Sequence, residues 1–140
     1  MAKDIIHYAI KDALLNDNWE VTNDPFTIDL DEDNTFFDID LAAQKNETTV
    51  FQNRSMLAIE IKSFAGASVI HAFHEALGQF LNYQAALDEQ GLESELFLAI
   101  SVRGWERLSA FKFIMRRIDQ FNLKFIVVNI QDKKIEKWIR

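Results

Sequence analysis

The sequence contains no cysteine, and this absence removes several chemistries at once. Disulfide bridges, thiolate nucleophiles and cysteine-ligated zinc are all excluded. Glycine and proline are also scarce, with four of the first and one of the second in 140 residues. Such a chain is expected to consist of long regular elements joined by few irregular loops. Its length predicts one domain, spanning residues 1–140, with a substantial core.

Long apolar runs are missing too. No segment approaches the length of a membrane span, and the first residues lack the apolar stretch of a signal peptide. We therefore expect a cytoplasmic protein without membrane association. The charge is one-sided, because 22 acidic and 15 basic residues give a net charge of −7. This charge argues against general DNA affinity unless a basic patch, divalent cations or a basic partner offsets it.

Hydrophobic periodicity predicts three helices, over residues 5–16, 69–88 and 105–122. Strands are expected at 26–30, 35–42, 56–63, 95–102 and 124–130, with a short strand-like segment at 19–22, a turn at 31–34 and an edge strand at 134–139. The predicted order of the main elements is α-β-β-β-α-β-α-β-β. This order indicates an α/β fold in which helices flank a mixed central sheet.

Two charges interrupt an apolar strand between Met56 and Ser63. Glu60 and Lys62 are two residues apart, so their side chains lie on the same face of that strand. Helices are expected to cover both faces of the sheet, and a buried unpaired charge is costly. The pair therefore calls for a partner, a metal or a wet cleft. The simpler interpretation is a salt bridge on a solvent-facing part of the sheet, with Glu60 exposed.

The preceding predicted strand also carries acidic residues at alternate positions. Asp38 and Asp40 share one face, and antiparallel pairing would place them opposite Glu60. Carboxylate oxygens on adjacent strands suit Mg²⁺ or Mn²⁺. Lys62 could then position an attacking water, as in a metal-dependent phosphodiesterase. The alternative is an acidic edge strand that resists aggregation.

Four polar side chains follow one another at four-residue intervals on the second predicted helix, at His71, Glu75, Gln79 and Tyr83. Positions four apart lie on one side of a helix, where Gln79 could hydrogen-bond a carboxylate and Tyr83 could contact a phosphate. An ordinary boundary between the apolar and polar faces of a helix explains the same spacing. His7 lies on the first predicted helix, and its position is compatible with either a structural or a functional role.

Short blocks spread from the N-terminus to about residue 100 carry a family resemblance. They are Ala2 to Asp4 with His7, Ala13-Leu14, Trp19, Asp24-Pro25, Ala58 to Phe64, Ala76 to Phe80, and Tyr83. In these blocks the chain resembles the XisH family, the cyanobacterial fdxN element excision controlling factors. The resemblance implies a restriction-endonuclease-like fold of the PD-(D/E)xK superfamily, whose core order is α-β-β-β-α-β.

The resemblance also implies metal ligands. The segment Glu60 to Lys62 corresponds to the (D/E)xK element of that superfamily, and Asp40 to Gln44 parallels the family's D-L-G-A-E. Asp40 and Glu60 would then hold Mg²⁺ or Mn²⁺. Ala42 and Gln44 depart from the family pattern, which leaves Asp38 as an alternative ligand.

Further roles come from the same resemblance. Gln79 and Tyr83 match the Q-x-x-x-Y element of RecB-like nucleases, and His7 could match the histidine on their first helix. XisH-like proteins act beside XisI, while a separate recombinase performs the excision. The expected partners are therefore an XisI-like protein and DNA, with a homo-oligomer left open. Two hypotheses follow: a controlling factor with a magnesium-dependent endonuclease-type site, or a non-catalytic regulator that binds XisI.

Overall fold

The computed structural model describes residues 2–30, 34–46 and 54–140. Its helices are α1 (Ala2–Asn16), α2 (Val69–Glu89), α3 (Val102–Ser109) and α4 (Lys112–Phe121). Its strands are β1 (Glu20–Asn23), β2 (Phe26–Asp29), β3 (Phe36–Ile39), β4 (Leu41–Asn46), β5 (Arg54–Ile61), β6 (Glu95–Ser101), β7 (Phe125–Asn129) and β8 (Lys134–Ile139). Most of the turn predicted at 31–34 lies outside the described residues. No helix in the described ranges is long and apolar enough to cross a membrane.

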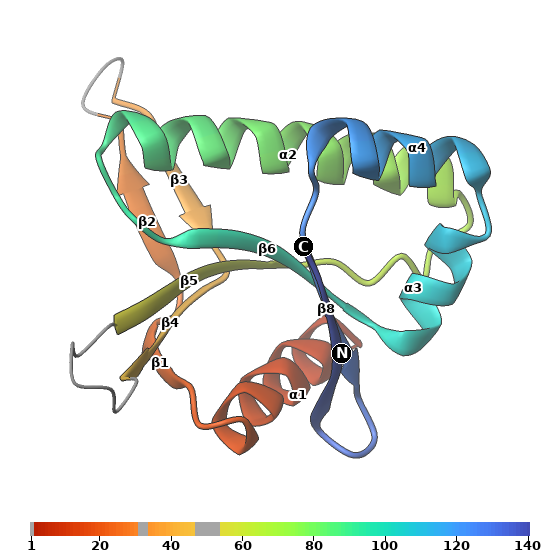
Figure 1. Ribbon diagram of the computed structural model, residues 1–140, viewed down its shortest axis with the longest axis horizontal. Helices are drawn as coiled ribbons and strands as arrows, with labels where there is room; N and C mark the ends of the chain where they lie inside the picture. The colour runs from red at the N-terminus through yellow and green to blue at the C-terminus, as the bar shows by residue number, and fades with distance from the viewer. Residues whose placement is uncertain (1, 31–33, 47–53) are drawn as a thin grey trace.

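Six strands form the main sheet in the order β1-β4-β5-β6-β7-β8, while β2 and β3 pair in a separate two-stranded sheet (Figure 1). β5, β6 and β7 run parallel, and β1, β4 and β8 pair antiparallel with their neighbours. The predicted mixed central sheet is therefore confirmed. With the β2–β3 hairpin set aside, the first elements follow the order α-β-β-β-α-β.

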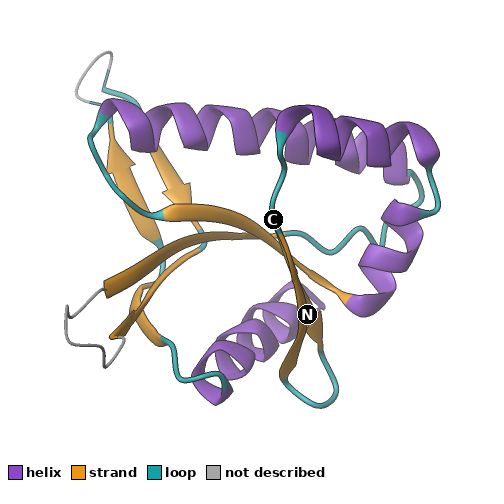
Figure 2. Ribbon diagram, viewed as in Figure 1, coloured by secondary structure: helices purple, strands orange, loops and turns teal. Residues whose placement is uncertain are grey.

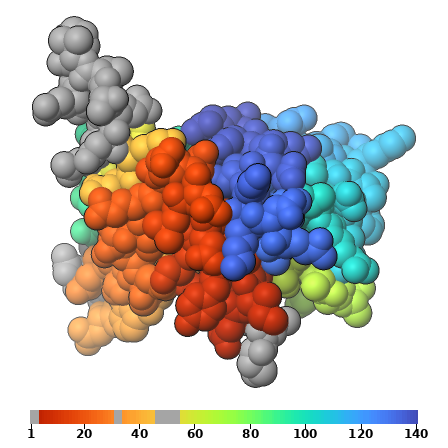
Figure 3. Space-filling model, turned by 90° about the horizontal axis from the view of Figure 1, so that it is seen from below, coloured from red at the N-terminus to blue at the C-terminus, as the bar shows by residue number. Residues whose placement is uncertain are grey.

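Helices cover both faces of this sheet, as Figure 2 shows. Successive side chains of β5 point to opposite faces of the sheet, so each face contributes to its own hydrophobic core. Leu57 and Ile59 lie in the core under α1, whereas Ala58 lies in the core under the other three helices. On the α1 side, that helix also lies beside β8, which the red and blue surfaces of Figure 3 display. An ion pair of 3.3 Å between Lys133 Nζ and Asp12 Oδ2 joins α1 to the turn that precedes β8.

The single strand predicted over residues 35–42 is wrong, because the chain forms two strands that belong to different sheets. β3 pairs with β2 and ends at Ile39, and β4 pairs with β5 and begins at Leu41. Ile39 is buried in the core under α2, but Leu41 is buried in the core under α1. Residues two apart on one strand share a face, so the chain must change direction at Asp40 between them.

The helix predicted over 105–122 is also wrong, since α3 and α4 are separate. Phe111 between them is extended, with φ −94° and ψ 109°. Leu108 and Ile114 are both fully buried, yet six residues correspond to about one and two-thirds helical turns. One continuous helix would point these two side chains in different directions, and the break lets both enter the core. At the other end of the chain, α1 begins at Ala2 rather than at the predicted residue 5, and Asp4 lies in its first turn.

Candidate functional site

The change of sheet at Asp40 brings its carboxylate to Glu60. The backbone N–H of Asp40 donates to Glu60 Oε1 at 3.2 Å, and the backbone N–H of Ile61 donates to Asp40 Oδ2 at 2.8 Å. Each carboxylate is thus held by the backbone of the neighbouring strand, where β4 begins and β5 ends. Two acidic side chains that are twenty residues apart in sequence are fixed in one place.

Lys62 lies against this pair. Its Nζ is 3.6 Å from Glu60 Oε2 and 4.0 Å from Glu75 Oε1. Its backbone N–H donates to the carbonyl oxygen of Ala99 at 2.9 Å, which keeps the chain beside β6 just beyond the end of β5. Glu75 is largely exposed, so the buried Glu60 is the more consequential partner of this ammonium group.

Glu60 is buried, with only 6% of its surface exposed. Among the described residues, it is the one charged residue that is buried. Burial, together with the charge of Asp40, raises the pKa of its carboxyl group to about 7, while the charge of Lys62 opposes the shift. Glu60 is therefore neither exposed nor distant from Asp40, and the geometry does not favour a surface salt bridge. A carboxylate confined in this way is stabilised in its charged form by a nearby cation.

Asp38 occupies a different position. It lies on β3 opposite Thr27 of β2, whose hydroxyl donates to Asp38 Oδ1 at 2.6 Å. Among the hydrogen bonds and ion pairs of the described residues, none links Asp38 to Asp40 or Glu60. Of the two aspartates that the sequence left open, Asp40 is therefore the one that the fold brings to Glu60.

The predicted stripe on α2 turns gradually from solvent into the core. His71 is exposed, whereas Tyr83 is buried with its ring 5.4 Å from that of Phe37. Burial raises the pKa of Tyr83 to about 12, and the charges of Glu60 and Asp40 add to the shift. The side-chain oxygen of Gln79 is buried and has no hydrogen-bond partner within the described structure. This oxygen is an acceptor that remains to be satisfied by a ligand or a water.

His7 is placed near the carboxylates without bonding to them. Its Nε2 is 2.9 Å from Asp24 Oδ1, while Lys11 Nζ is 2.8 Å from Asp24 Oδ2. The hydrogen bond from Lys11 lowers the pKa of Asp24 below its usual range, with a smaller contribution from His7. His7 nevertheless lines the same cleft as Asp40 and Lys62. The structure therefore gathers it at the edge of the site, held by Asp24.

That cleft has a volume of about 590 Å³ and opens where β5 and β6 end. α1 contributes Ile5, Ile6 and His7 to its walls, and α2 contributes Ala72 and Glu75. Asp40, the segment 61–65, Ser101 and Ile130 complete the lining. Helices from both faces of the sheet thus line the cleft at the ends of the central strands β5 and β6, beside the proposed ligand Asp40.

Residues of α3 that the sequence did not single out support this cleft. Arg107 donates to the carbonyl oxygens of Phe64 and Gly66, the latter at 2.9 Å, and so holds the loop that follows Lys62. Ser101 caps α3, since its Oγ accepts from the N–H of Gly104 at 2.9 Å. A serine directly after an apolar strand and before Val-Arg-Gly is a signal of a helix start that could have been recognised.

The donors at this site fit a hard divalent cation. Two carboxylates converge there, and oxygen ligands are those that Mg²⁺ prefers. The unpaired carboxamide oxygen of Gln79 belongs to α2, and Gln79 is not among the residues that line the cleft. No group of three or more histidine, aspartate or glutamate side chains poised to hold a metal occurs in residues 2–30, 34–46 and 54–140. A cation held by two carboxylates would keep several of its waters, which is usual for Mg²⁺.

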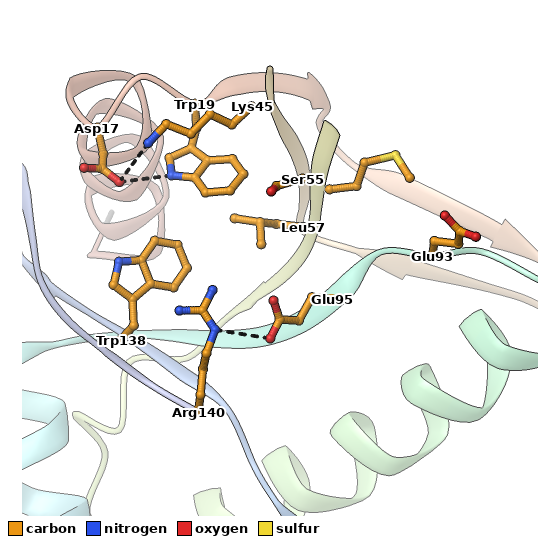
Figure 4. A pocket seen from close by; sticks show the side chains of 10 residues that line it. Asp17, Trp19, Lys45, Ser55, Leu57, Glu93, Glu95, Trp138 and Arg140 are labelled. Atoms are coloured by element: carbon orange, nitrogen blue, oxygen red, sulfur yellow. Dashed lines mark hydrogen bonds and ion pairs between the residues drawn. The ribbon is translucent and has the colours of Figure 1, made fainter. Parts of the chain in front are cut away.

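A second pocket, of about 380 Å³, lies at the opposite end of β5 and contains none of the predicted site residues (Figure 4). Trp19 and Trp138 form one side of it, with ring centroids 5.9 Å apart. Four of its charged groups are already paired, since Lys45 Nζ is 3.9 Å from Asp17 Oδ2 and Arg140 Nε is 3.4 Å from Glu95 Oε2. We therefore place the candidate site at Asp40 and Glu60.

Comparisons with known proteins agree with the fold and extend over almost the whole chain. Residues 1–136 match the family described as XisH protein. The crystal structure of an XisH family protein from Nostoc punctiforme PCC 73102 is similar at 30% identity and a TM-score of 0.82, covering 97% of this chain and 99% of that one. A fdxN element excision controlling factor protein from Anabaena variabilis is similar at 30% identity and a TM-score of 0.81, covering 98% and 99%. No curated protein matches the sequence.

Proposed function

The chain belongs to the XisH family, and we propose that it controls excision of a DNA element through a magnesium-dependent nuclease-type site. The observation that carries this proposal is the convergence of Asp40 and Glu60, with Lys62 ion-paired beside them. The role in excision extends to this chain what the name of its Anabaena variabilis relative says of that protein. The expected location is the cytoplasm, where the DNA would be reached.

The order of elements supports assignment to the PD-(D/E)xK superfamily. Without the β2–β3 hairpin, α1, β1, β4, β5, α2 and β6 follow the α-β-β-β-α-β order of that fold. Glu60 and Lys62 would be its (D/E)xK element at the end of β5, and Asp40 its preceding aspartate. Because one fold can carry many functions, the site rather than the topology has to be tested.

Each residue has a distinct role in the proposed reaction, which is hydrolysis of a phosphodiester bond. Asp40 and Glu60 would supply carboxylate oxygens to Mg²⁺ or Mn²⁺, and a bound cation would act as a Lewis acid on a phosphate oxygen. Lys62 would position the attacking water and offset negative charge as the phosphorus–oxygen bond to the leaving sugar breaks. Gln79 would offer its unpaired oxygen to a water at the site, and Tyr83 and His7 would contact the phosphate, as the resemblance to RecB-like nucleases implies.

The first experiment measures divalent-metal binding by calorimetric titration with Mn²⁺. The wild type should bind, whereas Asp40→Ala and Glu60→Ala should lose binding because each removes one of the two converging carboxylates. Asp38→Ala is the matched control, since that carboxylate is engaged with Thr27, and it should bind like the wild type. Identical isotherms for all four proteins would refute the metal site.

The second experiment tests catalysis directly. Purified protein, alone and with an XisI-like partner, is incubated with linear, supercoiled and branched DNA in Mg²⁺ or Mn²⁺. Cleavage that disappears in Lys62→Ala would establish the nuclease-type activity. Cleavage that survives this substitution would indicate a contaminating enzyme. DNA that stays intact under every condition would refute the proposed nuclease activity.

One observation favours a second function, that of a non-catalytic regulator which binds an XisI-like protein. Ile5, Tyr8 and Leu15 lie largely exposed on α1, at 64%, 64% and 55%. Their spacing places them along one side of the helix, and such an apolar stripe often marks a protein-binding surface. Loss of XisI binding in Tyr8→Asp, together with unchanged binding in Lys62→Ala, would support this regulatory role.

A further inference from the structure

The cleft beside Asp40 and Lys62 is unusual for a site that acts on a nucleic acid, because most of its wall is apolar. Side chains of Ile5, Ile6, Ile61, Phe64, Ala65, Ala72 and Ile130 form this wall. Its volume of about 590 Å³ is within the range of pockets that enclose a small organic group. Asp40 and Lys62 line the same cleft as these apolar side chains, so a single ligand could contact both the charged and the apolar groups.

The same cleft offers few cations to a regular duplex. Among its described lining residues, only Lys62 and His7 carry basic side chains, and Asp40 and Glu75 carry acidic ones. Three arginines outside the cleft are engaged, since Arg107 holds loop carbonyls and the guanidinium groups of Arg116 and Arg117 lie over the ring of Phe113 on α4. A protein that grips paired DNA normally neutralises many phosphates, and this cleft is not built to do so.

We propose that the cleft of Asp40, Lys62 and the apolar wall receives one nucleobase turned out of the stack, with its phosphate held at the carboxylate–lysine site. The preferred substrate is therefore a strand with an unpaired nucleotide, as in a bulge, a branch or a single strand, rather than a regular duplex. This inference rests on the proposed function and names the substrate of the same site.

The chemistry of a base matches both parts of the cleft. Its planar faces are largely apolar and suit the isoleucine and phenylalanine side chains, and its polar edge can bond the hydroxyl groups of Ser63 and Ser101, which also line the cleft. Turning a base out of a duplex costs unpairing and unstacking free energy, and this cost is smallest where the base is already unpaired. The acidic chain thus selects its substrate by burial of a base rather than by charge.

An apolar side chain of a protein partner is the competing occupant. It would fill the apolar part of the cleft but would bring no anionic group to Lys62, which also lines it. A nucleotide carries an anionic group next to its base, so it satisfies the apolar wall and the lysine together. The geometry favours the nucleotide for this reason.

The experiment compares binding of two DNA duplexes that are identical except for one bulged 2-aminopurine, whose fluorescence reports its unstacking. Binding is measured by fluorescence anisotropy with Mg²⁺ and again with a chelator. The wild type should prefer the bulged duplex at least about tenfold, and 2-aminopurine emission should change on binding. Ala72→Phe, which fills the cleft from α2, should abolish the preference. Ala85→Phe on the exposed side of the same helix is the matched control and should keep it.

The outcomes separate this inference from the proposed function. Equal affinity for both duplexes, or a preference that survives Ala72→Phe, overturns the base-binding cleft, while cleavage of paired DNA would leave the nuclease-type site standing. Mn²⁺ binding at Asp40 and Glu60 without any binding of DNA overturns the inference and the nuclease function, and leaves only a metal site. Loss of a protein partner in Ala72→Phe, with unchanged binding of DNA, assigns the cleft to a protein side chain and overturns the proposal.

Discussion

Gly104 of α3 packs directly against the carbonyl oxygen of Ser63, one residue after Lys62. A β-carbon at Gly104 would lie 2.9 Å from that oxygen and 3.2 Å from Ser101 Oγ. The close approach leaves no room for a side chain, so α3 and the loop that follows β5 are fixed against each other. The candidate site is thus supported from a helix that contributes none of its proposed ligands.

Gly104→Ala should therefore destabilise the protein by about 1–3 kcal/mol, because the added methyl group meets a backbone atom that cannot move aside cheaply. Gly78→Ala on α2 is the matched control. A β-carbon there meets nothing within 4 Å, so alanine should stabilise the helix by about 0.5–1 kcal/mol. Urea unfolding of both variants measures the difference, and equal effects would show that the contact between Gly104 and Ser63 is unimportant.

Arg107→Ala should release the loop that Arg107 holds through the carbonyl oxygens of Phe64 and Gly66. Loss of these bonds is expected to cost about 1–3 kcal/mol and to speed hydrogen exchange of the amides at 64–67. Arg103→Ala changes an exposed arginine on the same helix and should stay within about 0.5 kcal/mol of the wild type. Unchanged exchange of the loop in Arg107→Ala would mean that other contacts hold it.

The pKa of Glu60 makes stability depend on pH. Its folded value of about 7 lies above the ordinary value of 4.5, so the folded state binds more protons than the unfolded state between these values. The free energy of unfolding should accordingly fall as pH rises from 4.5 to about 7, by an amount of the order of a few kcal/mol, and remain lower above pH 7.

Glu60→Gln should remove this dependence, because glutamine stays neutral. Urea unfolding at a series of pH values is expected to show the variant gaining stability relative to the wild type as pH rises. Glu106→Gln, at an exposed position on α3, should follow the wild-type profile. Parallel profiles for wild type and Glu60→Gln would contradict a raised pKa at Glu60.

Lys62→Met should move the same pH transition to higher values, because the ammonium group of Lys62 holds the pKa of Glu60 down. The measurement is again the pH dependence of urea unfolding, now compared at its midpoint. Glu75→Gln removes the exposed partner of Lys62 and should change stability by less than about 1 kcal/mol. A transition that stays in place without Lys62 would show that Glu60 does not sense its charge.

Gln79→Leu should leave the protein as stable as the wild type or raise its stability by about 1 kcal/mol, because the buried oxygen of Gln79 has no partner to lose. The same change should reduce metal-dependent cleavage of DNA if the oxygen serves the site. Gln84→Leu is a control on α2, since it removes only a surface bond to Asp88. A large loss of stability in Gln79→Leu would mean that an ordered water already satisfies this oxygen.

Much of the fold could be predicted from local patterns. The strand around Glu60 was recognisable because Leu57, Ile59 and Ile61 alternate with residues of the opposite face, and the structure confirms that strand as part of β5. Helix α2 and strand β8 were also expected close to their observed bounds. In these segments a single periodicity agrees with the packing, so local reasoning was enough.

Other features depended on contacts that no local pattern contains. Residues 36–41 alternate as one strand would, yet Ile39 and Leu41 enter different cores and the chain changes sheets at Asp40. The sequence pattern alone could not show which of Asp38 and Asp40 lies beside Glu60, because that depends on this change of sheet. Arg107 was equally hidden, because its partners lie more than forty residues earlier in the chain.

By itself the sequence determined that the side chains of Glu60 and Lys62 point the same way at the end of a mostly apolar strand, because side chains two residues apart in an extended chain do so. It also determined that those charges needed partners, since burial of a charge is costly. Only the tertiary structure decided that Asp40 is one of those partners and that an apolar cleft adjoins them. Both depend on long-range packing, in which the two hydrophobic cores pull Ile39 and Leu41 to opposite sides and leave Asp40 facing the end of β5.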